Sequence, residues 1–379
     1  MIILNIKLYG NEILDWKLSM KLIVTVGTRP NFVKISPLVK QLRNVEYKLV
    51  HTGQHYDVCM SECFFKDLDL PDPDINLGVG SGTHAEQTGK IMIEFEKVCQ
   101  KEKPDLVVVV GDVNSTLGCA LAAAKLNIKV AHIEAGVRVF DNSIPEEVNR
   151  RLVDHISDVL FAPNYSAVDN LVREGISTKK IHLVGNIMVD SLKANLDKCS
   201  GTAYYKPYVL ATIHRPENVD NEKNLVSILM ALKAISKTIP VIFPVHPRTM
   251  KRITEFKLNN YITNSYVTDF SIRYPQSYLT FLSWLKGAQA VITDSGGIQV
   301  ETSVLRIPCI TISRHTPWDC TLRYGTNTLV SCNTDEILEA FSRLGKRTAD
   351  KADKIPSIWD GRASKRIVEI LLKGGSHGK

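Results

Sequence analysis

The chain has 379 residues, enough for two domains with cores of their own, and its 44% hydrophobic and 23% charged residues are typical of a globular protein. A net charge of +7, from 47 Lys and Arg against 40 Asp and Glu, favours an anionic small-molecule ligand. The basic residues do not form runs, which argues against nucleic-acid binding, and no stretch reaches the ~18 apolar residues of a membrane span.

The first 19 residues lack the basic start and the small-residue cleavage site of a signal peptide. They contain polar breaks, and Met20 directly precedes a clean strand pattern. Either residues 1–19 form a peripheral extension or Met20 is the true start, and we favour the second. The eight cysteines are scattered without metal-ligand spacing, so we expect reduced thiols in a cytoplasmic protein.

The first half of the chain alternates between apolar, β-rich runs and helical patterns. We predict strands at 21–27, 47–51, 105–110, 128–133, 159–163 and 181–184. Helices are predicted between them, at 31–43, 84–101, 114–125 and 189–196. Two more are predicted with one bound each: one begins at 145, and one ends at about 175. Residues 139–144 have no period and are predicted to be a loop.

Charged side chains follow several of these strands. Arg29 and Lys34 come after the first strand, while Asp112 and Glu134 follow the third and the fourth. Open α/β sheets bind ligands at the carboxyl ends of their parallel strands. These side chains are therefore candidates for one site, although two solvated basic residues are the simpler interpretation of Arg29 and Lys34.

The βα alternation begins again after an aperiodic stretch at 198–206. We predict strands at 208–212, 241–245, 290–293 and 308–312, and helices at 222–237, 278–286, 335–344 and 364–373. Residues 313–324 are predicted to be an irregular loop. The first two of these strands end at His214-Arg215 and at His246.

The strand at 290–293 leads into the sequence D-S-G-G, which opens a helix. Gly296 and Gly297 let a ligand approach the backbone, and the amino end of a helix carries partial positive charge. The turn at Ser295, Gly296 and Gly297 is therefore predicted to bind a phosphate. An ordinary strand-to-helix turn capped by Asp or Ser is the simpler interpretation.

Repeated βα units predict an α/β fold with two facing, doubly wound, Rossmann-like domains and a ligand in the cleft between them. We assign residues 1–19 to the extension or mis-assigned start, 20–197 to the first domain and 207–355 to the second, nucleotide-binding domain. Residues 356–379 are assigned to a C-terminal helix that packs back on the first domain.

The candidate side chains fall into a cationic and an acidic set. The cationic set suits a pyrophosphate and consists of Arg29, Lys34, His214 and Arg215. The acidic set would be repelled by that anion and suits acid–base chemistry on an attached sugar; it consists of Asp112, Glu134 and Glu146. Alternatively, the carboxylates are ion-pair partners of Arg138 or Arg150. No metal-ligand cluster, G-x-G-x-x-G, P-loop or G-x-S-x-G sequence is present.

Several segments together resemble one family. They are G-T-R-P at 27–30, T-G-Q-H at 52–55, H-I-E-A-G-V-R at 132–138, P-E-E-V-N-R at 145–150, H-R-P-E-N at 214–218 and D-S-G-G-I-Q-V-E at 294–301. In this order they resemble the non-hydrolysing UDP-N-acetylglucosamine 2-epimerases, from about residue 21 to the C-terminal helix. Each motif alone is weak, whereas the ordered set is specific.

The resemblance implies the glycosyltransferase-B architecture and an isomerase that needs neither NAD nor a metal. It implies that UDP is eliminated to leave 2-acetamidoglucal and then adds back, which converts UDP-N-acetylglucosamine to UDP-N-acetylmannosamine. It further implies a cytoplasmic homodimer that serves cell-surface polysaccharide synthesis, with a UDP-sugar as its partner.

The same resemblance implies roles for individual residues. Arg29, Lys34 and Arg138 would bind the substrate, Arg150 would orient the acids Asp112, Glu134 and Glu146, and His214 would stabilise the departing diphosphate. The turn at 295–297 would donate to phosphate oxygens, and Glu301 would accept from the ribose. A second, activating UDP-sugar site would use Gln54, Arg215 and His246.

The chain departs from the family pattern at three places. Asn31 replaces an acidic residue after G-T-R-P, Val300 replaces the first of two glutamates, and residues 314–319 replace a common T-E-R-P loop. A 2,3-diacetamido sugar or its uronate therefore stays open as the substrate. A glycosyltransferase of the same fold, a hydrolysing epimerase and a non-catalytic nucleotide-sugar binder also stay open as functions, although the intact acidic set speaks against the binder.

Overall fold

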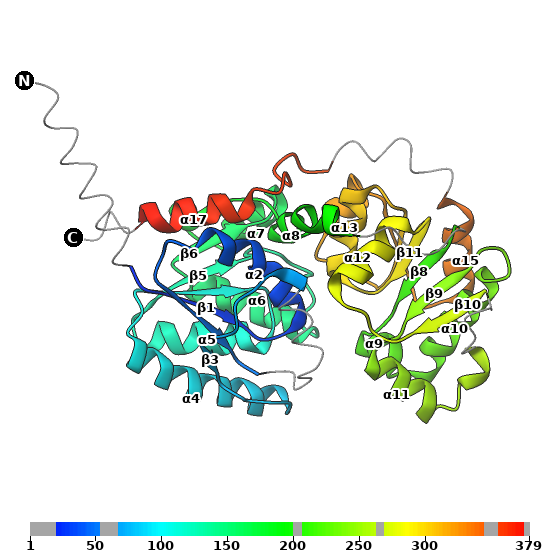
Figure 1. Ribbon diagram of the computed structural model, residues 1–379, viewed down its shortest axis with the longest axis horizontal. Helices are drawn as coiled ribbons and strands as arrows, with labels where there is room; N and C mark the ends of the chain where they lie inside the picture. The colour runs from blue at the N-terminus through cyan, green and yellow to red at the C-terminus, as the bar shows by residue number, and fades with distance from the viewer. Residues whose placement is uncertain (1–19, 54–66, 200–206, 263–268, 345–354, 375–379) are drawn as a thin grey trace, which may run out of the picture. The chain divides into compact units, whose positions relative to one another are not determined.

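The computed structural model describes residues 20–53, 67–199, 207–262, 269–344 and 355–374. The chain divides into two compact units, one formed by Met1–Ala194 with Ile358–Lys379 and the other by Asn195–Ser357. In both units parallel strands alternate with helices (Figure 1).

Among the described residues of the first unit, seven parallel strands form a sheet in the order β3-β2-β1-β4-β5-β6-β7. The strands are β1 Leu22–Val26, β2 Tyr47–His51, β3 Ile75–Asn76, β4 Leu106–Val110, β5 Lys129–Ile133, β6 Val159–Ala162 and β7 Ile181–Leu183. The helices are α2 Arg29–Gln41, α4 His84–Glu102, α5 Asn114–Lys125, α6 Pro145–Ile156, α7 Tyr165–Arg173, α8 Ile187–Asn195 and α17 Ala363–Gly374.

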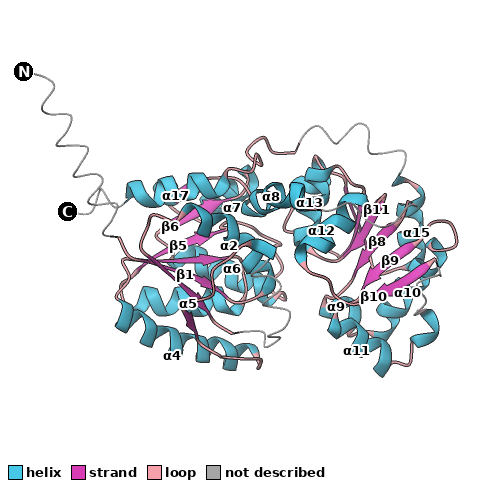
Figure 2. Ribbon diagram, viewed as in Figure 1, coloured by secondary structure: helices cyan, strands magenta, loops and turns pink. Residues whose placement is uncertain are grey.

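The central strands of this sheet are covered on both faces, which explains their unbroken apolar sequences (Figure 2). Ile23 and Val107 face one way and join a buried cluster with α4, α5 and α6. The small residues of α5 allow close packing: a Cβ on Gly118 would lie 2.7 Å from the Ile91 side chain of α4. This face therefore depends on the small-residue pattern that predicted α5.

Among the described residues of the second unit, six parallel strands form a sheet in the order β10-β9-β8-β11-β12-β13. The strands are β8 Val209–Thr212, β9 Val241–Pro244, β10 Phe270–Arg273, β11 Ala290–Thr293, β12 Cys309–Ile312 and β13 Asn327–Val330. The helices are α9 Pro216–Val219, α10 Glu222–Ile235, α11 Pro247–Glu255, α12 Tyr278–Gly287, α13 Gly296–Leu305, α14 Asp319–Arg323 and α15 Thr334–Ser342.

Each sheet has one point at which the strand order reverses direction. In the first unit β1 pairs with both β2 and β4, and in the second β8 pairs with both β9 and β11. At such a point the loops that leave adjacent strands diverge and open a crevice at the carboxyl edge. The loops after β1 and β4, and those after β8 and β11, carry most of the candidate residues.

The C-terminal helix belongs to the first unit, where α17 packs beside α2 (Figure 1). Its amino end is held by the buried Asp190 of α8, whose carboxylate accepts from the Ala363 and Ser364 amides at 3.0 and 2.7 Å. The Trp359 indole donates to the Pro163 carbonyl at 2.9 Å. The α/β fold with doubly wound parallel sheets is thus confirmed.

Several local predictions were wrong or incomplete. Residues 319–323 form α14 inside the stretch predicted to be an irregular loop, and β3, β10, β13, α9 and α11 were not predicted. The predictions for residues 1–19 lie outside the described residues. No helix in the described part of the chain is long and apolar enough to cross a membrane.

Candidate active site

Glu134 lies directly after β5 in an unusual environment. Its backbone adopts φ +73°, in the left-handed region that few non-glycine residues occupy, and the residue is only 7% exposed. One carboxylate oxygen, Oε2, accepts from the Lys34 ammonium at 2.5 Å. The other, Oε1, is buried and has no hydrogen-bond partner among the described residues. A buried, unsatisfied carboxylate oxygen is costly, and such strain gathers at functional sites.

The end of β4 lies against this pair. A Cβ on Gly111 would lie 3.0 Å from the Lys34 ammonium and 3.6 Å from Glu134 Oε2, and the φ of +72° at this position favours glycine. Asn31 ties the loop after β1 to this strand: it accepts from the Thr28 amide and donates to the Val110 carbonyl. The residue that departs from the family pattern therefore joins β1 to β4 beside the acids.

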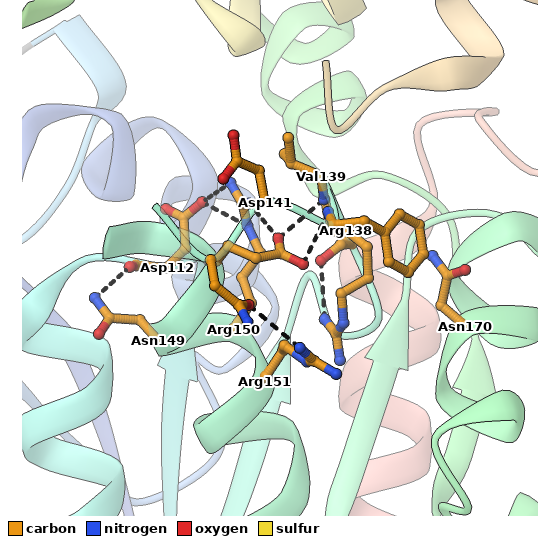
Figure 3. Close-up of polar contacts among 12 residues, drawn as sticks. Asp112, Arg138, Val139, Asp141, Asn149, Arg150, Arg151 and Asn170 are labelled. Atoms are coloured by element: carbon orange, nitrogen blue, oxygen red, sulfur yellow. Dashed lines mark hydrogen bonds and ion pairs between the residues drawn. The ribbon is translucent and has the colours of Figure 1, made fainter. Parts of the chain in front are cut away.

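Asp112, which directly follows Gly111, is held by Arg150 from α6 (Figure 3). The Arg150 Nε and Nη2 atoms donate to Asp112 Oδ2 at 3.0 and 2.5 Å. Arg150 in turn binds Glu147 at 3.0 Å, and Glu147 accepts from the Val139 and Phe140 amides. Arg150 thus orients Asp112, and Glu147 fixes both Arg150 and the loop that precedes α6.

The neighbouring Glu146 is half-buried in the first turn of α6, where it directly precedes the fully buried Glu147. Arg29 begins α2 and is also half-buried. The sequence analysis selected Glu146 as a candidate acid, whereas Glu147 has the buried position that connects Arg150 to the preceding loop. The contact with the loop at 139–140 distinguishes Glu147 from the acid beside it.

The expectation that Arg138 binds substrate does not fit its position. Its guanidinium is 0% exposed because the carboxylates of Glu174 and Asp154 bind it at 2.6 and 2.7 Å. Burial alone would raise the Asp154 pKa, but His132 and Arg138 outweigh it and hold that pKa below its usual range. Arg138 is therefore a buried structural cation.

In the second unit, Asp294 organises the strand ends. It is 0% exposed and accepts from the amides of His214 and Arg215 at 2.9 and 2.8 Å, and from the Asn218 side chain at 3.1 Å. Its Oδ1 also lies 3.0 Å from His214 Nδ1. Burial raises the Asp294 pKa, but the contacts with His214, the Arg215 amide and Asn218 together outweigh it and lower that pKa overall. The imidazole is thereby fixed while 41% of the side chain stays exposed.

The turn at 295–297 only partly matches its expectation. The Ser295 amide already donates to Thr293 Oγ1 at 3.0 Å, so it is not available to a ligand. Gly296 and Gly297 are half-exposed and occupy the first helical positions of α13, where amides have no intrahelical acceptor. A Cβ on Gly296 would lie 3.3 Å from the Trp318 indole nitrogen and 4.0 Å from an Arg215 guanidinium nitrogen. Donors therefore converge at this turn.

Glu301 lies on the same helix and is buried, with its carboxylate accepting from the Tyr278 hydroxyl at 3.0 Å. Burial raises its pKa to about 7 although the Tyr278 hydrogen bond opposes the shift. Burial likewise raises the Tyr278 pKa. Glu301, the residue expected to accept from the ribose, is thus shielded from solvent by its burial.

Of the residues expected at a second site, His246 caps α11 and its ring lies 5.6 Å from that of His214. Arg215 lies beside the turn at 295–297, and Gln54 is outside the described residues. In the described part of the chain, no group of three His, Cys, Asp or Glu side chains could hold a metal ion.

Comparison with known proteins now places the chain. The family model described as UDP-N-acetylglucosamine 2-epimerase matches residues 38–372. The chain belongs to this family. Membership makes the protein an enzyme of the isomerase type, as the motif order indicated.

Similar proteins agree with that assignment. The UDP-N-acetylglucosamine 2-epimerase of Methanocaldococcus jannaschii is 43% identical over 369 residues, which cover 94% of this chain and 100% of the relative. A crystal structure of that enzyme in complex with UDP-GlcNAc and UDP has a TM-score of 0.87 at 44% identity, covering 94% and 100% of the two chains.

The other comparisons concern substrate and fold. The UDP-2,3-diacetamido-2,3-dideoxy-D-glucuronate 2-epimerase of Pseudomonas aeruginosa is 41% identical over 364 residues, 93% of this chain and 100% of the relative. A lipopolysaccharide outer core galactosyltransferase has a TM-score of 0.51 at 14% identity, covering 94% and 100% of the two chains. The second likeness concerns the fold alone and confirms the glycosyltransferase-B architecture.

Proposed function

We propose that the protein catalyses the reversible C2 epimerisation of UDP-N-acetylglucosamine to UDP-N-acetylmannosamine through elimination and re-addition of UDP. The observation that carries the proposal is Glu134, a strained and buried carboxylate with one oxygen bound to Lys34 and the other without a partner among the described residues. A carboxylate so placed is suited to accept a proton from a bound ligand.

In the proposed reaction a base removes the C2 proton while the C1–O bond to the diphosphate breaks. The electron pair of the C2–H bond forms the C1–C2 double bond of 2-acetamidoglucal, and the C1–O pair leaves with UDP. In the return step UDP oxygen attacks C1 and an acid delivers a proton to the opposite face of C2. The overall change is redox-neutral, so its balance requires no nicotinamide.

The two faces of C2 require separate acid–base groups. Glu134 and Asp112 are candidates because they directly follow, or lie just after, the adjacent strands β5 and β4. Glu146 is the third candidate. Arg150 binds and orients Asp112, while the Lys34 ammonium lies 2.5 Å from one oxygen of Glu134. Arg29, at the amino end of α2, is assigned to the nucleotide diphosphate.

Diphosphate departure is the step that the second unit would assist. The C2 proton lies on the acetamide-bearing carbon, which has no adjacent carbonyl, and is hardly acidic, so the leaving group must separate early and its charge needs stabilisation. His214 and the amides of Gly296 and Gly297 supply donors after two adjacent strands, β8 and β11. Glu301 is assigned to the ribose hydroxyls, and Arg215 with His246 to an activating second UDP-sugar.

A related substrate has its own support. Residues 314–319 replace the common T-E-R-P loop, and Arg314 and His315 within them are exposed. The exposed Arg314 guanidinium would suit the carboxylate of a UDP-2,3-diacetamido uronate. The 41% identity to the Pseudomonas aeruginosa enzyme supports the same substrate.

The proposed enzyme acts as a cytoplasmic homodimer in cell-surface polysaccharide synthesis. Val148 and Leu152 lie one turn apart on α6 and are 40% and 49% exposed, which suits an apolar contact with a second copy. The buried free thiols of Cys99, Cys119 and Cys309 suit a reducing compartment. Light scattering of the purified protein decides the oligomeric state.

The reaction is tested by incubating the protein with UDP-N-acetylglucosamine in D₂O and following the sugar by NMR. Deuterium at C2 of a sugar that still carries UDP, together with the manno epimer, is the expected result. Free UDP with N-acetylmannosamine would instead indicate a hydrolysing epimerase. No change without an added acceptor would indicate a transferase. The same assay with the diacetamido sugar and its uronate ranks the substrates.

A further inference from the structure

We infer that His132 is a positioning residue: an imidazolium whose two N–H groups clamp the two backbone turns carrying Asp112 and Glu134. His132 lies on β5 and is 0% exposed. Its Nδ1 lies 2.7 Å from Asp154 Oδ1, and its Nε2 lies 2.8 Å from the Gly111 carbonyl oxygen. The effect of His132 on catalysis rests on the proposed function. The charge of its ring is inferred from the hydrogen bonds alone.

The partners determine the charge of the ring. A carbonyl oxygen can only accept, and an ionised carboxylate can only accept, so both ring nitrogens must donate. Asp154 is ionised because its other oxygen accepts from the Gly136 amide at 3.0 Å and from Arg138 at 2.7 Å. A neutral imidazole would place a lone pair against one of these oxygens in a buried site.

The buried charged groups around His132 are paired within the unit. Asp154 faces the ring directly, Arg138 binds Asp154, and Glu174 binds Arg138. The exposed Arg151 lies 3.6 Å from Glu174 at the outer end of this chain of contacts, so the named groups carry three positive charges against two carboxylates. Buried charges are tolerated when they are paired and hydrogen-bonded in this way.

The geometry of the clamp reaches both catalytic acids. The Gly111 carbonyl at one end directly precedes Asp112, and the Gly136 amide at the other lies two residues after Glu134. Gly111, Glu134 and Gly136 have φ angles of +72°, +73° and +77°, so the clamp spans three left-handed positions. A buried ion pair between them would hold the strained Glu134 backbone and set its spacing from Asp112.

The charge is tested on the wild-type protein by ¹⁵N NMR with labelled histidine. His132 is identified by the signal absent from His132→Gln, or by coupling of its Nε2 proton to the ¹³C-labelled Gly111 carbonyl if that variant does not fold. Both ring nitrogens should carry a proton at neutral pH, because each faces an oxygen that can only accept. An unprotonated ring nitrogen at neutral pH would overturn the inference.

The positioning role is tested with His132→Gln and His132→Asn, which remove the charge and one donor. We expect kcat to fall by about 100-fold with little change in KM, because misplacement of the acids affects the transition state more than substrate binding. The matched control is Glu174→Gln, which weakens the outer ion pair and leaves both backbone contacts of the clamp intact; its kcat should stay near that of wild type.

An unchanged kcat in a folded His132 variant, or an equal loss in Glu174→Gln, would overturn the positioning role. If neither His132 variant folds, amide exchange of wild-type Gly136 replaces them: slow exchange supports the clamp, and fast exchange overturns it. A wild-type protein without epimerase activity would overturn the proposed function, while the NMR result would still decide the charge of His132.

Discussion

Replacing Glu134 with glutamine removes one buried negative charge and keeps the shape of the side chain. The structure sets two magnitudes. Loss of a general base costs about 10²–10⁴-fold in turnover. The Lys34 ammonium, whose side chain is 11% exposed, keeps an amide oxygen as acceptor but loses its counter-charge, so we expect about 2 kcal/mol of destabilisation.

The assay separates these two effects. Turnover is followed by deuterium entry at C2 of the UDP-sugar, and stability by urea unfolding of the same preparation. The matched control is Glu102→Gln, which removes the charge from another Lys–Glu pair, with Lys21, at the amino edge of the same sheet. The control should lose a little stability and no turnover. Near-normal turnover in Glu134→Gln would remove Glu134 from the mechanism.

Three further predictions concern stability. The pKa of Glu301 is raised to about 7 from an ordinary 4.5, so between these pH values the folded state holds a proton that the unfolded chain releases. The free energy of unfolding should therefore fall by about 3 kcal/mol as the pH rises through this range. The Glu301→Gln variant, unfolded across the same range, should not show that fall. Asp190→Ala removes the acceptor of two α17 amides and should lower the free energy of unfolding by about 3 kcal/mol. The Ala363 and Ser364 amides should then exchange faster than in wild type. Equal exchange would show that Asp190 does not hold the amino end of α17. Gly136→Ala would place a Cβ 2.2 Å from the Ala167 carbonyl and should prevent folding, whereas Gly175→Ala, also at positive φ but with open space, should cost only about 1–2 kcal/mol.

The elements that the sequence predicted well are those whose burial is continuous. Residues 114–125 and 290–293 match α5 and β11 in full, because small residues packed on a sheet and a strand covered on both faces leave an unbroken apolar signature. The edge strand β13 is half-exposed, and α11 is almost wholly polar outside two buried positions. Their formation depends on neighbouring elements rather than on their own apolar pattern.

The same limit applies to the candidate site. Positions after central strands could be predicted, because parallel strands bring their carboxyl ends to one edge. Pairings across the chain could not: Arg138 and Glu174 are 36 residues apart, and nothing local distinguishes a cation held inside the protein from one that faces a ligand. For the same reason the sequence analysis selected Glu146 and not Glu147, although it is Glu147 that fixes Arg150.

Both units contain a buried aspartate that binds a histidine Nδ1 and the backbone amides of a strand-end turn. In the first unit the pair is His132 with Asp154, and in the second it is His214 with Asp294. The difference lies at the other ring nitrogen. His132 Nε2 donates to the Gly111 carbonyl, which fills its last hydrogen-bonding position, whereas the His214 side chain remains 41% exposed. The same residue pair can therefore fix a backbone in one unit and leave an imidazole open to solvent in the other, and the difference is whether a carbonyl occupies Nε2.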